Sequence, residues 1–339
     1  MISKRVILFG LGQVGRVAAQ QLLDAGFEIE AAYSRGIYIG EDLSEVLGRG
    51  VAGIPVVDVS EFDAERSSAA AALFCTTGAA QDLLVEPCQC LRAGINVVTI
   101  AEGGTYPWTY APEISNTINR AGIEGMATLT STGMTDTYMV HLPAVLASTV
   151  PGVRKISVST SGDFGRLGAC ALQELPLGLP VEQVTEMLEN APADSPQLPS
   201  ISGQCLEAMA SLMGLGSGEI SNEIGFVIAD EDIEVKTTGA LIQQGMIAGV
   251  REKVTMITTE GVELSIDFVA EIYADDKPEV QGVTIEDAAG QALTMRVGPT
   301  PGVEYTAAIA INRLFDVMEA EPGLRTIDKL SAPLFRPNQ

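Results

Sequence analysis

The sequence predicts an α/β protein of two domains, in which a doubly wound parallel sheet precedes an α+β domain with a largely antiparallel sheet. The chain has 339 residues, whereas single cores usually stop growing near ~250 residues. Residues 4–129 alternate short apolar runs with amphipathic segments, as in a parallel sheet covered by helices on both faces. Beyond Gly133 the segments become longer, β-branched and alternating, and their close succession favours antiparallel strands.

Strands and helices alternate in the first predicted domain. Short apolar runs predict strands at residues 5–9, 28–33, 71–75, 96–100 and 125–128. Amphipathic periodicity predicts helices at residues 14–25, 40–47, 80–93 and 112–121. Gly26, Gly94 and Gly122 follow predicted helices directly, at the position where glycine commonly ends a helix.

The second predicted domain combines strands with fewer helices. Alternating segments predict strands at residues 155–161, 225–238, 249–259 and 262–273. Helices are expected at residues 181–189 and 204–213, separated by a Pro-rich surface loop at 191–199 that can cover a site. A helix at residues 304–319 has one apolar stripe and is expected to return to the first domain. The predicted domains are therefore residues 1–133, completed by 303–339, and residues 134–302.

Charge and hydropathy exclude several partners. The 44 acidic residues outnumber the 20 basic ones and give a formal net charge of −24, which repels phosphate backbones and anionic membranes. Apolar stretches are far shorter than the ~20 residues that cross a bilayer, and the first residues enter a strand without an export signal. We therefore expect a cytoplasmic protein that binds neither nucleic acid nor membrane. The low lysine content also fits a salt-adapted surface.

Residues that bind metals or act as nucleophiles are few. The five cysteines are odd in number and lack Cys-x-x-Cys spacing, so we expect buried thiols and no metal site. The single histidine, His141, lies in the apolar run 138–146, where a packing role is expected. The sequence contains no Gly-x-Ser-x-Gly elbow, so it does not support a serine hydrolase.

A glycine motif follows the first strand and opens the first helix. It reads Gly10-Leu11-Gly12-Gln13-Val14-Gly15. The first glycine permits a tight turn, the second lets backbone N–H groups approach a pyrophosphate, and the third lets the helix pack close to the strand. The helix N-terminus directs the positive end of its dipole toward the phosphates. In this context the motif predicts a Rossmann domain that binds a nicotinamide dinucleotide.

The end of the second strand indicates the form of the cofactor. NAD sites place a carboxylate there, whereas this chain has Ser34 and Arg35, which suit the 2′-phosphate of NADP. We therefore expect NADP, with NAD also accepted, and the alternative is that Arg35 is a solvated loop charge. Thr76, Thr77 and Gly78 follow another strand and are expected beside the ribose groups.

Glu102 is the candidate catalytic residue. It comes directly after the buried strand at 96–100, at the carboxyl edge where α/β sites form. The two glycines after it let the backbone turn sharply, and an apolar wall that favours the protonated carboxyl is expected from Tyr106, Pro107 and Trp108. The alternative is that Glu102 is a helix-capping or loop charge.

Several of these segments carry a resemblance that extends over nearly the whole chain. They are Ile7-Leu8-Phe9-Gly10-Leu11-Gly12, residues 40–48, Thr76-Thr77-Gly78, Ile100-Ala101-Glu102 with Tyr106-Pro107-Trp108, and Pro322-Gly323-Leu324-Arg325-Thr326-Ile327. The chain resembles the family of 2,4-diaminopentanoate dehydrogenase and the native amine dehydrogenases, a branch near dihydrodipicolinate reductase. In that family the glutamate before Tyr-Pro-Trp is the catalytic carboxylate, so the resemblance assigns this role to Glu102. The implied reaction is reductive amination of a ketone or aldehyde by ammonia with NAD(P)H, reversible as oxidative deamination.

The chain departs from the family pattern at two places. The family commonly has Asn-Pro-Gly after the last Rossmann strand, where this chain has Gly133, Met134 and Thr135, so the floor of the pocket is altered. The family often carries an Asp where Ser34 stands, which supports the NADP prediction. The histidine pair and lysine of dihydrodipicolinate reductase are absent, which disfavours that activity.

The substrate pocket is expected to involve both domains. Its candidate residues, each of which also has a core-packing alternative, are Trp108, Met134, Thr137, Tyr138, Phe164, Arg166 and Cys205. The expected partners are a small carbonyl compound or amine, ammonia, and a second copy of the chain that pairs through the second domain. Two alternatives stay open: a reductase of amino acids or cyclic imines in which Arg166 binds a carboxylate, and a non-catalytic NADP(H) sensor.

Overall fold

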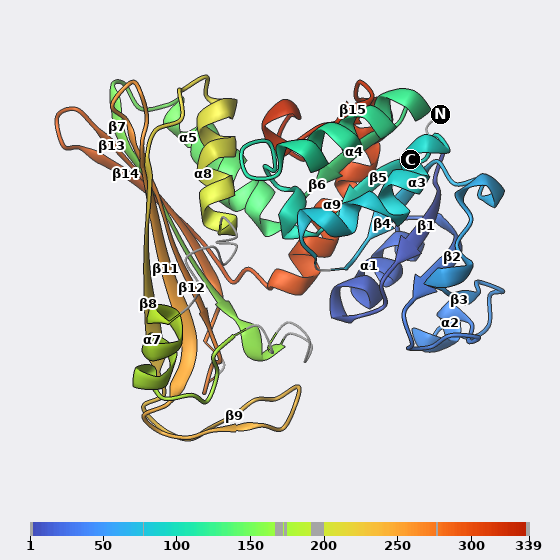
Figure 1. The fold of residues 1–339 in the computed structure, drawn as a ribbon, viewed down its shortest axis with the longest axis horizontal. Coiled ribbons are helices and arrows are strands. Elements are labelled where there is room, and N and C mark those ends of the chain that lie inside the picture. Colours follow the sequence, from blue (N-terminus) through green and yellow to red (C-terminus); the bar gives the residue numbers. More distant parts are fainter. Residues whose placement is uncertain are drawn as a thin grey trace. The chain divides into compact units, whose positions relative to one another are not determined.

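The computed structural model describes residues 3–76, 78–166, 172, 175–190, 200–275 and 277–336. The chain divides into two compact units, the first formed by Met1–His141 with Val303–Gln339 and the second by Leu142–Gly302. Figure 1 shows both units as a ribbon coloured along the sequence. The first unit continues past residue 133, where the sequence placed the boundary, because Asp136 binds both His141 and Arg313 of the returning segment.

The first unit is built on a parallel sheet. Its strands are β1 (Arg5–Phe9), β2 (Glu28–Ser34), β3 (Val56–Asp58), β4 (Ala71–Phe74), β5 (Asn96–Thr99), β6 (Thr128–Ser131) and β15 (Gly323–Leu324). They lie in the order β15-β6-β5-β4-β1-β2-β3, and each runs parallel to its neighbours. The order reverses at β1, and ligands of such sheets bind at this switch point, beyond the carboxyl ends of the strands. The Rossmann sheet predicted from the sequence is confirmed.

Helices cover both faces of this sheet. They are α1 (Gln13–Asp24), α2 (Leu43–Val46), α3 (Glu86–Arg92), α4 (Pro112–Gly125) and α9 (Gly302–Glu319). Alternate residues of β1 point to opposite faces, so Val6 and Leu8 pack with α1 and α9, whereas Ile7 and Phe9 pack with α3 and α4. α9 returns to the first unit, as its apolar stripe predicted.

The predicted end of α4 and the strand predicted after it are wrong. The helix runs on to Gly125, and β6 begins only at Thr128. A Cβ on Gly122 would lie 2.7 Å from the Cα of Gly323, so this glycine allows the start of β15 to approach the helix and does not end it. The chain turns at Met126, which has a left-handed φ of 57°.

Two other helical segments of the first unit are shorter than predicted. Segment 40–47 is helical only in α2, because Asp42 caps that helix and its carboxylate accepts a hydrogen bond from the Ser44 N–H at 2.9 Å. Segment 80–93 divides into a 3-10 turn, η3 (Ala80–Leu84), and α3. Periodicity therefore predicts the place of these helices and not their lengths.

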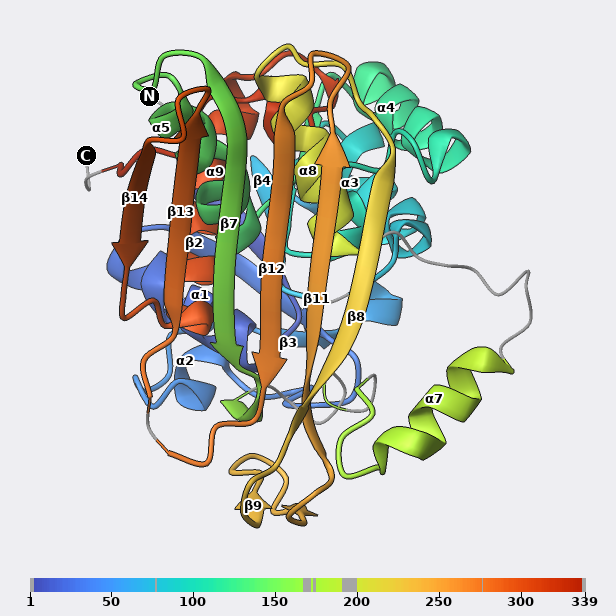
Figure 2. The ribbon, with the colours of Figure 1, turned by 90° about the vertical axis from the view of Figure 1, so that its left-hand side faces the viewer.

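The second unit is built on a mixed, mostly antiparallel sheet. Its strands are β7 (Val153–Asp163), β8 (Ile220–Ile228), β11 (Ile247–Ile257), β12 (Glu263–Glu271), β13 (Val280–Asp287) and β14 (Ala292–Val297). Figure 2 shows their order, β14-β13-β7-β12-β11-β8, in which β7 and β12 are parallel and the other neighbours antiparallel. A small hairpin joins β9 (Ile233–Glu234) to β10 (Leu241–Ile242). The largely antiparallel sheet predicted from the sequence is confirmed.

Helices pack on one face of this second sheet. α8 (Ile201–Leu212) packs on β11 and β12, and α5 (Leu142–Ala147) packs on β7 and β13. In Figure 2 both helices lie behind the strands. α7 (Val181–Glu189) forms where a helix was predicted. The Pro-rich segment 191–199, expected to be a surface loop, lies outside the described residues.

The strand predicted at 225–238 is wrong, because two strands form there. β8 ends at Ile228 and β9 begins at Ile233. Acidic residues occupy the turn between them, and the Asp232 carboxylate accepts a hydrogen bond from the Gln244 N–H at 2.8 Å. β13 and β14 were not predicted from the sequence. β14 is an edge strand with mostly exposed side chains, so it lacks the apolar signal of a buried strand.

Two kinds of feature are absent from the residues that the structure describes, membrane-spanning helices and metal clusters. Within that part of the chain, no helix combines the length and apolarity that a bilayer crossing requires. The same residues contain no group of three or more His, Cys, Asp or Glu side chains placed to hold a metal ion.

Candidate active site

The glycine loop leaves β1 in a tight turn. Gly10 has a left-handed φ of 87°, and its N–H donates to the Tyr33 carbonyl at 2.9 Å. A Cβ on Gly10 would lie 2.8 Å from the Cys75 carbonyl oxygen and 2.9 Å from the Thr76 side chain. Glycine therefore lets the loops after β1 and β4 lie in direct contact.

Gly12 and Gly15 have different surroundings. Gly12 is the N-cap of α1, and a Cβ built there meets no atom within 4 Å. No side chain caps this helix and its first turn has no acidic residue, so its N–H groups and positive dipole end are open to an anion. A Cβ on Gly15 would lie 1.9 Å from the Gly10 carbonyl oxygen. Gly15 therefore allows α1 to pack against the turn, while Gly12 leaves room beside the backbone.

The other residues of the motif lie in the core or on the first turn of α1. Leu11 is buried in the apolar cluster shared with α9, and Val14 packs against that cluster. Gln13 begins α1, and its side-chain oxygen is buried without a hydrogen-bond partner among the described residues. A buried amide left unsatisfied in a native fold calls for a partner such as a ligand or water.

Ser34 and Arg35 lie at the carboxyl end of β2. Ser34 is buried, and the Arg35 side chain is 75% exposed. The Arg35 guanidinium donates to the Glu86 carboxylate at 3.1 Å, so an acidic side chain holds it at this edge of the sheet. Such an exposed pair contributes little to stability and leaves the guanidinium accessible to a phosphate.

A second arginine, Arg16, lies close to the same edge and was not predicted from the sequence. Its guanidinium donates to the Tyr38 hydroxyl at 3.3 Å, and its buried Nε has no partner among the described residues. Tyr38 follows β2 with a left-handed φ of 58°. The signal was the place of Arg16 directly after the third glycine of the motif, where a cation on α1 lies near the phosphate-binding loop.

The loop after β4 links the glycine loop to the loop that carries Glu102. Thr76 is exposed, and its side chain faces Gly10. The Gly78 carbonyl accepts a hydrogen bond from the Gly103 N–H at 3.2 Å. Thr77, the third candidate residue of this loop, lies outside the described residues. The loops after β1, β4 and β5 therefore lie side by side at the carboxyl edge of the sheet.

The backbone on both sides of Glu102 is held by hydrogen bonds. The Ala101 carbonyl accepts from the Ser131 hydroxyl at 2.7 Å, and the Gly103 carbonyl accepts from the Tyr110 hydroxyl. A Cβ on Gly103 would lie 2.3 Å from a backbone nitrogen of η3, so only glycine lets the loop pack against that turn. Glu102 itself is exposed. The fold thus presents this carboxylate on a fixed backbone at the switch-point edge.

Trp108, predicted as part of an apolar wall beside Glu102, is half-buried, and its place beside Glu102 stays a prediction. The Trp108 ring packs against the core cluster that contains α4, and its indole N–H donates to the Thr326 hydroxyl at 3.1 Å. Glu102 is exposed, so water reaches its carboxylate. The N–H of a Trp packed against the core needs a hydrogen-bond acceptor, and Thr326 supplies one.

Met134, Thr137 and Tyr138 lie together after β6. All three are half-buried, and the last two belong to η5 (Thr135–His141), a π-helical turn. The Thr137 hydroxyl oxygen is buried without a hydrogen-bond partner among the described residues. Segment 138–146, the apolar run that contains His141, is π-helical up to His141 and α-helical in α5. π-Helical turns are rare and are frequent at functional sites.

His141 belongs to a buried charge network. Its Nδ1 lies 2.7 Å from the Asp136 carboxylate, and its Nε2 lies 3.1 Å from the Leu330 carbonyl. The packing role predicted for His141 is confirmed. Both ring nitrogens face oxygen atoms, and only the imidazolium form carries two N–H donors. Burial alone would lower the pKa of His141, but the hydrogen bond and charge of Asp136 outweigh it and raise that pKa.

Asp136 and Arg313 form the centre of this network and were not predicted. Arg313 donates two hydrogen bonds to Asp136, at 2.8 and 2.9 Å, and neither side chain is exposed. Burial by itself would raise the pKa of the Asp136 carboxyl, but hydrogen bonds and charges of His141 and Arg313 hold it below its usual value. One feature of the sequence could have revealed this network. Arg313 lies between Ala310 and Val317 on the apolar face of the last helix, which is buried.

The remaining candidate pocket residues belong to the second unit. Phe164 and Arg166 lie in the 3-10 turn η6 (Phe164–Arg166) that follows β7. The Arg166 guanidinium pairs with the Glu279 carboxylate at 3.4 Å, and the Phe164 ring contacts Phe268. Cys205 is completely buried in α8, which disfavours a pocket-lining role for its thiol. Within their own unit these side chains therefore have structural partners.

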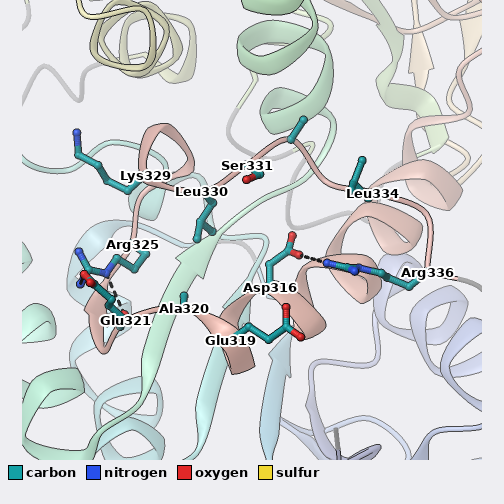
Figure 3. A pocket seen from close by; sticks show the side chains of 11 residues that line it. Asp316, Glu319, Ala320, Glu321, Arg325, Lys329, Leu330, Ser331, Leu334 and Arg336 are labelled. Carbon is teal, nitrogen blue, oxygen red and sulfur yellow. Dashed lines mark hydrogen bonds and ion pairs between the residues drawn. The ribbon is translucent and has the colours of Figure 1, made fainter. Parts of the chain in front are cut away.

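A cavity of about 360 Å³ lies between the end of α9 and the C-terminal segment (Figure 3). It is lined by Asp316, Glu319, Ala320, Glu321, Arg325, Lys329, Leu330, Ser331, Ala332, Leu334 and Arg336. Four of its charges form two ion pairs, Arg336 with Asp316 at 3.1 Å and Arg325 with Glu321 at 2.9 Å. The cavity contains neither Glu102 nor any residue of the glycine loop, so it is separate from the candidate active site.

The fold and this edge of the sheet define a class of protein. A Rossmann sheet with an open glycine loop and a carboxylate on a neighbouring loop is the arrangement of an NAD(P)-dependent dehydrogenase. The chain belongs to the family described as the 2,4-diaminopentanoate dehydrogenase C-terminal domain, which matches residues 136–336. The protein is thus an NAD(P)-dependent oxidoreductase acting on CH–NH2 groups.

Similar proteins confirm the resemblance predicted from the sequence. 2,4-Diaminopentanoate dehydrogenase of Acetoanaerobium sticklandii is 23% identical over 343 residues, which cover 98% of this chain and 95% of that protein. The structure of an amine dehydrogenase from Mycobacterium smegmatis has a TM-score of 0.90 at 26% identity and covers 99% of this chain and 98% of that chain. A dipicolinate-bound dihydrodipicolinate reductase from Paenisporosarcina shares the fold, with a TM-score of 0.51 at 14% identity over 96% of this chain and 99% of that chain.

Proposed function

We propose that the protein catalyses the reductive amination of a small ketone or aldehyde by ammonia, with NAD(P)H as the reductant, and the reverse oxidative deamination of a primary amine. In the forward direction the carbonyl compound, ammonia, NAD(P)H and a proton give the amine, NAD(P)+ and water. The observation that carries the proposal is the Glu102 carboxylate, exposed on a fixed backbone beside the loops after β1 and β4. The likeness to an amine dehydrogenase supports the same reaction.

The residues of the glycine loop fit the pyrophosphate of a dinucleotide. The space beside Gly12, the uncapped N-terminus of α1 and the unsatisfied Gln13 side chain all lie at the same helix end. Gly12 and the residues after it would hold the phosphates through backbone N–H groups, and Thr76 lies where a ribose would pass. A bound nicotinamide would supply hydride to the substrate carbon.

Glu102 would act on protons and charge. Its carboxylate would accept a proton from ammonium, so that ammonia can attack the carbonyl carbon, and would return a proton to the hydroxyl that leaves as water. Its negative charge would stabilise the cationic iminium carbon before reduction. Ser131 and Tyr110 fix the backbone on both sides of Glu102, so the point from which its side chain extends is the same before and after substrate binds.

We propose NADP(H) as the preferred cofactor, with NAD(H) also accepted. Arg35 would bind the 2′-phosphate together with the Ser34 hydroxyl, and Arg16 lies near the same edge. The carboxylate of Glu86 shares the Arg35 guanidinium, so this edge carries both a cation and an acid. Because NAD sites have a carboxylate at this edge, the presence of Glu86 beside Arg35 leads us to expect that NAD(H) also binds.

A second candidate is dehydrogenation of a substrate that carries a carboxylate, which the likeness to 2,4-diaminopentanoate dehydrogenase favours. Arg166 is the cation that would bind that carboxylate, but its guanidinium already pairs with Glu279. We therefore favour a neutral substrate. In Arg166→Met, kcat/KM for 2-amino-4-oxopentanoate is expected to stay within about tenfold of wild type, whereas loss of a carboxylate-binding arginine costs ~100-fold or more. A short alkyl ketone is the control substrate.

The experiment that tests the proposed function is NADPH oxidation in the presence of ammonium and a panel of ketones and aldehydes. Turnover that requires ammonium supports reductive amination. Turnover without ammonium contradicts it and indicates a carbonyl or imine reductase. Binding of NADPH without turnover of any compound indicates a sensor that uses the Rossmann domain for recognition alone.

We further propose that two copies pair through the face of the second sheet that α5 and α8 leave uncovered. On β7 the buried Ile156 and Val158 face the helices, so Ser157 and Ser159 face the opposite side, where small side chains allow close approach. Figure 2 shows this face toward the viewer. Light scattering that gives a dimer for the wild type and a monomer for Ser159→Arg would support the assignment; a monomeric wild type contradicts it.

A further inference from the structure

The Asp136 carboxylate is buried and fully hydrogen-bonded. Its Oδ1 accepts from His141 Nδ1 at 2.7 Å and from Arg313 at 2.9 Å, and its Oδ2 accepts from the Thr132 hydroxyl at 2.6 Å and from Arg313 at 2.8 Å. A carboxylate with donors on both oxygens has one position and one orientation. Asp136 therefore fixes the element on which it lies, the π-helical turn η5.

Arg313 ties this turn to α9 and to the C-terminal segment. Besides its two bonds to Asp136, it donates to the Asp316 carboxylate at 2.9 Å and to the Ser331 carbonyl at 2.6 Å. Asp316 also accepts from Arg336 at 3.1 Å, as Figure 3 shows. Asp136 and Arg313 are separated by 177 positions in the sequence. The Asp136–Arg313 pair thus fixes η5, the turn that follows β6, relative to α9.

The turn held in this way follows β6, the strand whose end contacts the Glu102 loop. β6 is the neighbour of β5, and the Ser131 hydroxyl at its end donates to the Ala101 carbonyl, directly before Glu102. Thr137 and Tyr138 follow Asp136 in η5, and both are half-buried. A π-helical turn of a few residues has little stability of its own, so its position depends on such anchors.

We infer that Asp136 is a positioning residue: its buried pair with Arg313 holds η5 so that Thr137 and Tyr138 form a fixed wall of the substrate site beside Glu102. The inference rests on the proposed function, because it places substrate at this edge of the sheet. Asp136 touches neither substrate nor cofactor in this scheme. The buried pair sets the width of the substrate site and through it the preference among carbonyl compounds.

The experiment compares Asp136→Asn with Asp316→Asn. Both substitutions remove one carboxylate charge from Arg313, but only the first lies on η5. We expect Asp136→Asn to raise KM for the preferred ketone by about tenfold or more and to change the ranking of ketones by chain length, while the Kd for NADPH stays near wild type. Asp316→Asn is expected to leave KM and the ranking unchanged. Equal KM values and equal rankings of ketones in the two variants would overturn the inference. A purely structural role would lower the amount of folded protein, and with it the total activity of each variant, without changing KM.

Two further measurements keep the test decisive. If Asp136→Asn does not fold, Arg313→Lys takes its place, because it keeps the positive charge but cannot donate the two parallel hydrogen bonds to the Asp136 carboxylate. An unchanged KM and ranking of ketones in Arg313→Lys would then overturn the inference. Amide hydrogen exchange of residues 135–141 is a readout that does not depend on turnover. Faster exchange in Asp136→Asn, or in its replacement, than in Asp316→Asn supports the inference that the Asp136–Arg313 pair holds η5, even if the proposed reaction fails. Equal exchange in the two variants overturns it.

Discussion

The N–H of Gly103 donates a hydrogen bond to the carbonyl of Gly78 at 3.2 Å. This bond joins the loop that carries Glu102 to the loop after β4, where Thr76 lies against Gly10. The loop that carries the proposed proton-transfer group is therefore joined to the glycine loop through the loop after β4. Substitutions at this edge are expected to separate into those that affect cofactor binding and those that affect catalysis.

Glu102→Gln is expected to lower kcat/KM for reductive amination by ~10²–10⁴-fold, or roughly 3–5 kcal/mol in barrier, because the amide cannot exchange protons. The Kd for NADPH, measured by fluorescence titration, is expected to stay near wild type, since the pyrophosphate is assigned to the glycine loop. A loss of activity below about tenfold would sink the assignment of Glu102 as the proton-transfer group.

Gly12→Ala is expected to fold as the wild type does and to bind NADPH at least about tenfold more weakly. The new methyl group meets no protein atom within 4 Å, but it occupies the space where the pyrophosphate approaches the backbone. Melting temperature and NADPH titration check both halves of the prediction. Normal NADPH binding by a folded Gly12→Ala protein would place the pyrophosphate elsewhere.

Gly15→Ala is the matched control for this loop. Its Cβ would lie 1.9 Å from the Gly10 carbonyl oxygen, so α1 must move and the free energy of unfolding is expected to fall by about 1–3 kcal/mol. Urea unfolding measures this loss. A Gly15→Ala protein as stable as the wild type would contradict the close packing of helix and turn.

Arg35→Ala is expected to weaken NADPH binding by roughly 1.5–3 kcal/mol and to leave NADH binding nearly unchanged, since only NADPH carries the 2′-phosphate. Glu86→Gln is the control, because it removes the acid that shares the guanidinium without removing the cation. We expect it to strengthen NADPH binding. Equal losses for NADPH and NADH in Arg35→Ala would show that Arg35 does not select the phosphate.

The contribution of His141 to the stability of the protein is expected to fall as the pH rises above ~6.5, the ordinary histidine pKa. The pKa of His141 is raised in the folded protein, so its contribution is complete below the unfolded value of ~6.5 and is lost as the pH passes the folded pKa. Asp136 on its own turn favours the imidazolium, whereas Arg313 on α9 opposes it. Urea unfolding of wild type and His141→Gln across this range measures the effect. The difference between the two proteins should shrink at alkaline pH, and a constant difference contradicts the assignment.

Asp136, in the same network, has the opposite pH dependence: its contribution to stability is expected to fall as the pH is lowered. The pKa of Asp136 is lowered in the folded protein, so its contribution is present above the ordinary aspartate pKa of ~3.9 and is lost as the pH falls through the folded value. The two groups together are therefore expected to make the first unit most stable at intermediate pH.

Local patterns in the sequence account for the parallel sheet, the glycine loop and the place of Glu102. Strand and helix periodicity are properties of short windows, and the spacing of Gly10, Gly12 and Gly15 reflects contacts within a single strand–turn–helix unit. The helix at 304–319 was predictable for the same reason, because its apolar stripe lies within one element. Edge strand β14 was not, since its exposed side chains leave no apolar pattern.

Contacts between distant segments decided the rest. The Thr326 hydroxyl accepts a hydrogen bond from the Trp108 N–H, Glu86 accepts one from Arg35, and Arg313 holds Asp136. Each of these pairs joins elements whose proximity depends on how helices and loops pack on the sheet, and no periodicity in either segment records the partner. The sequence by itself therefore determined which loops reach the carboxyl edge of the sheet. Only the tertiary structure decided which side chains hold them there, because a buried charge is tolerated only where packing brings it a partner.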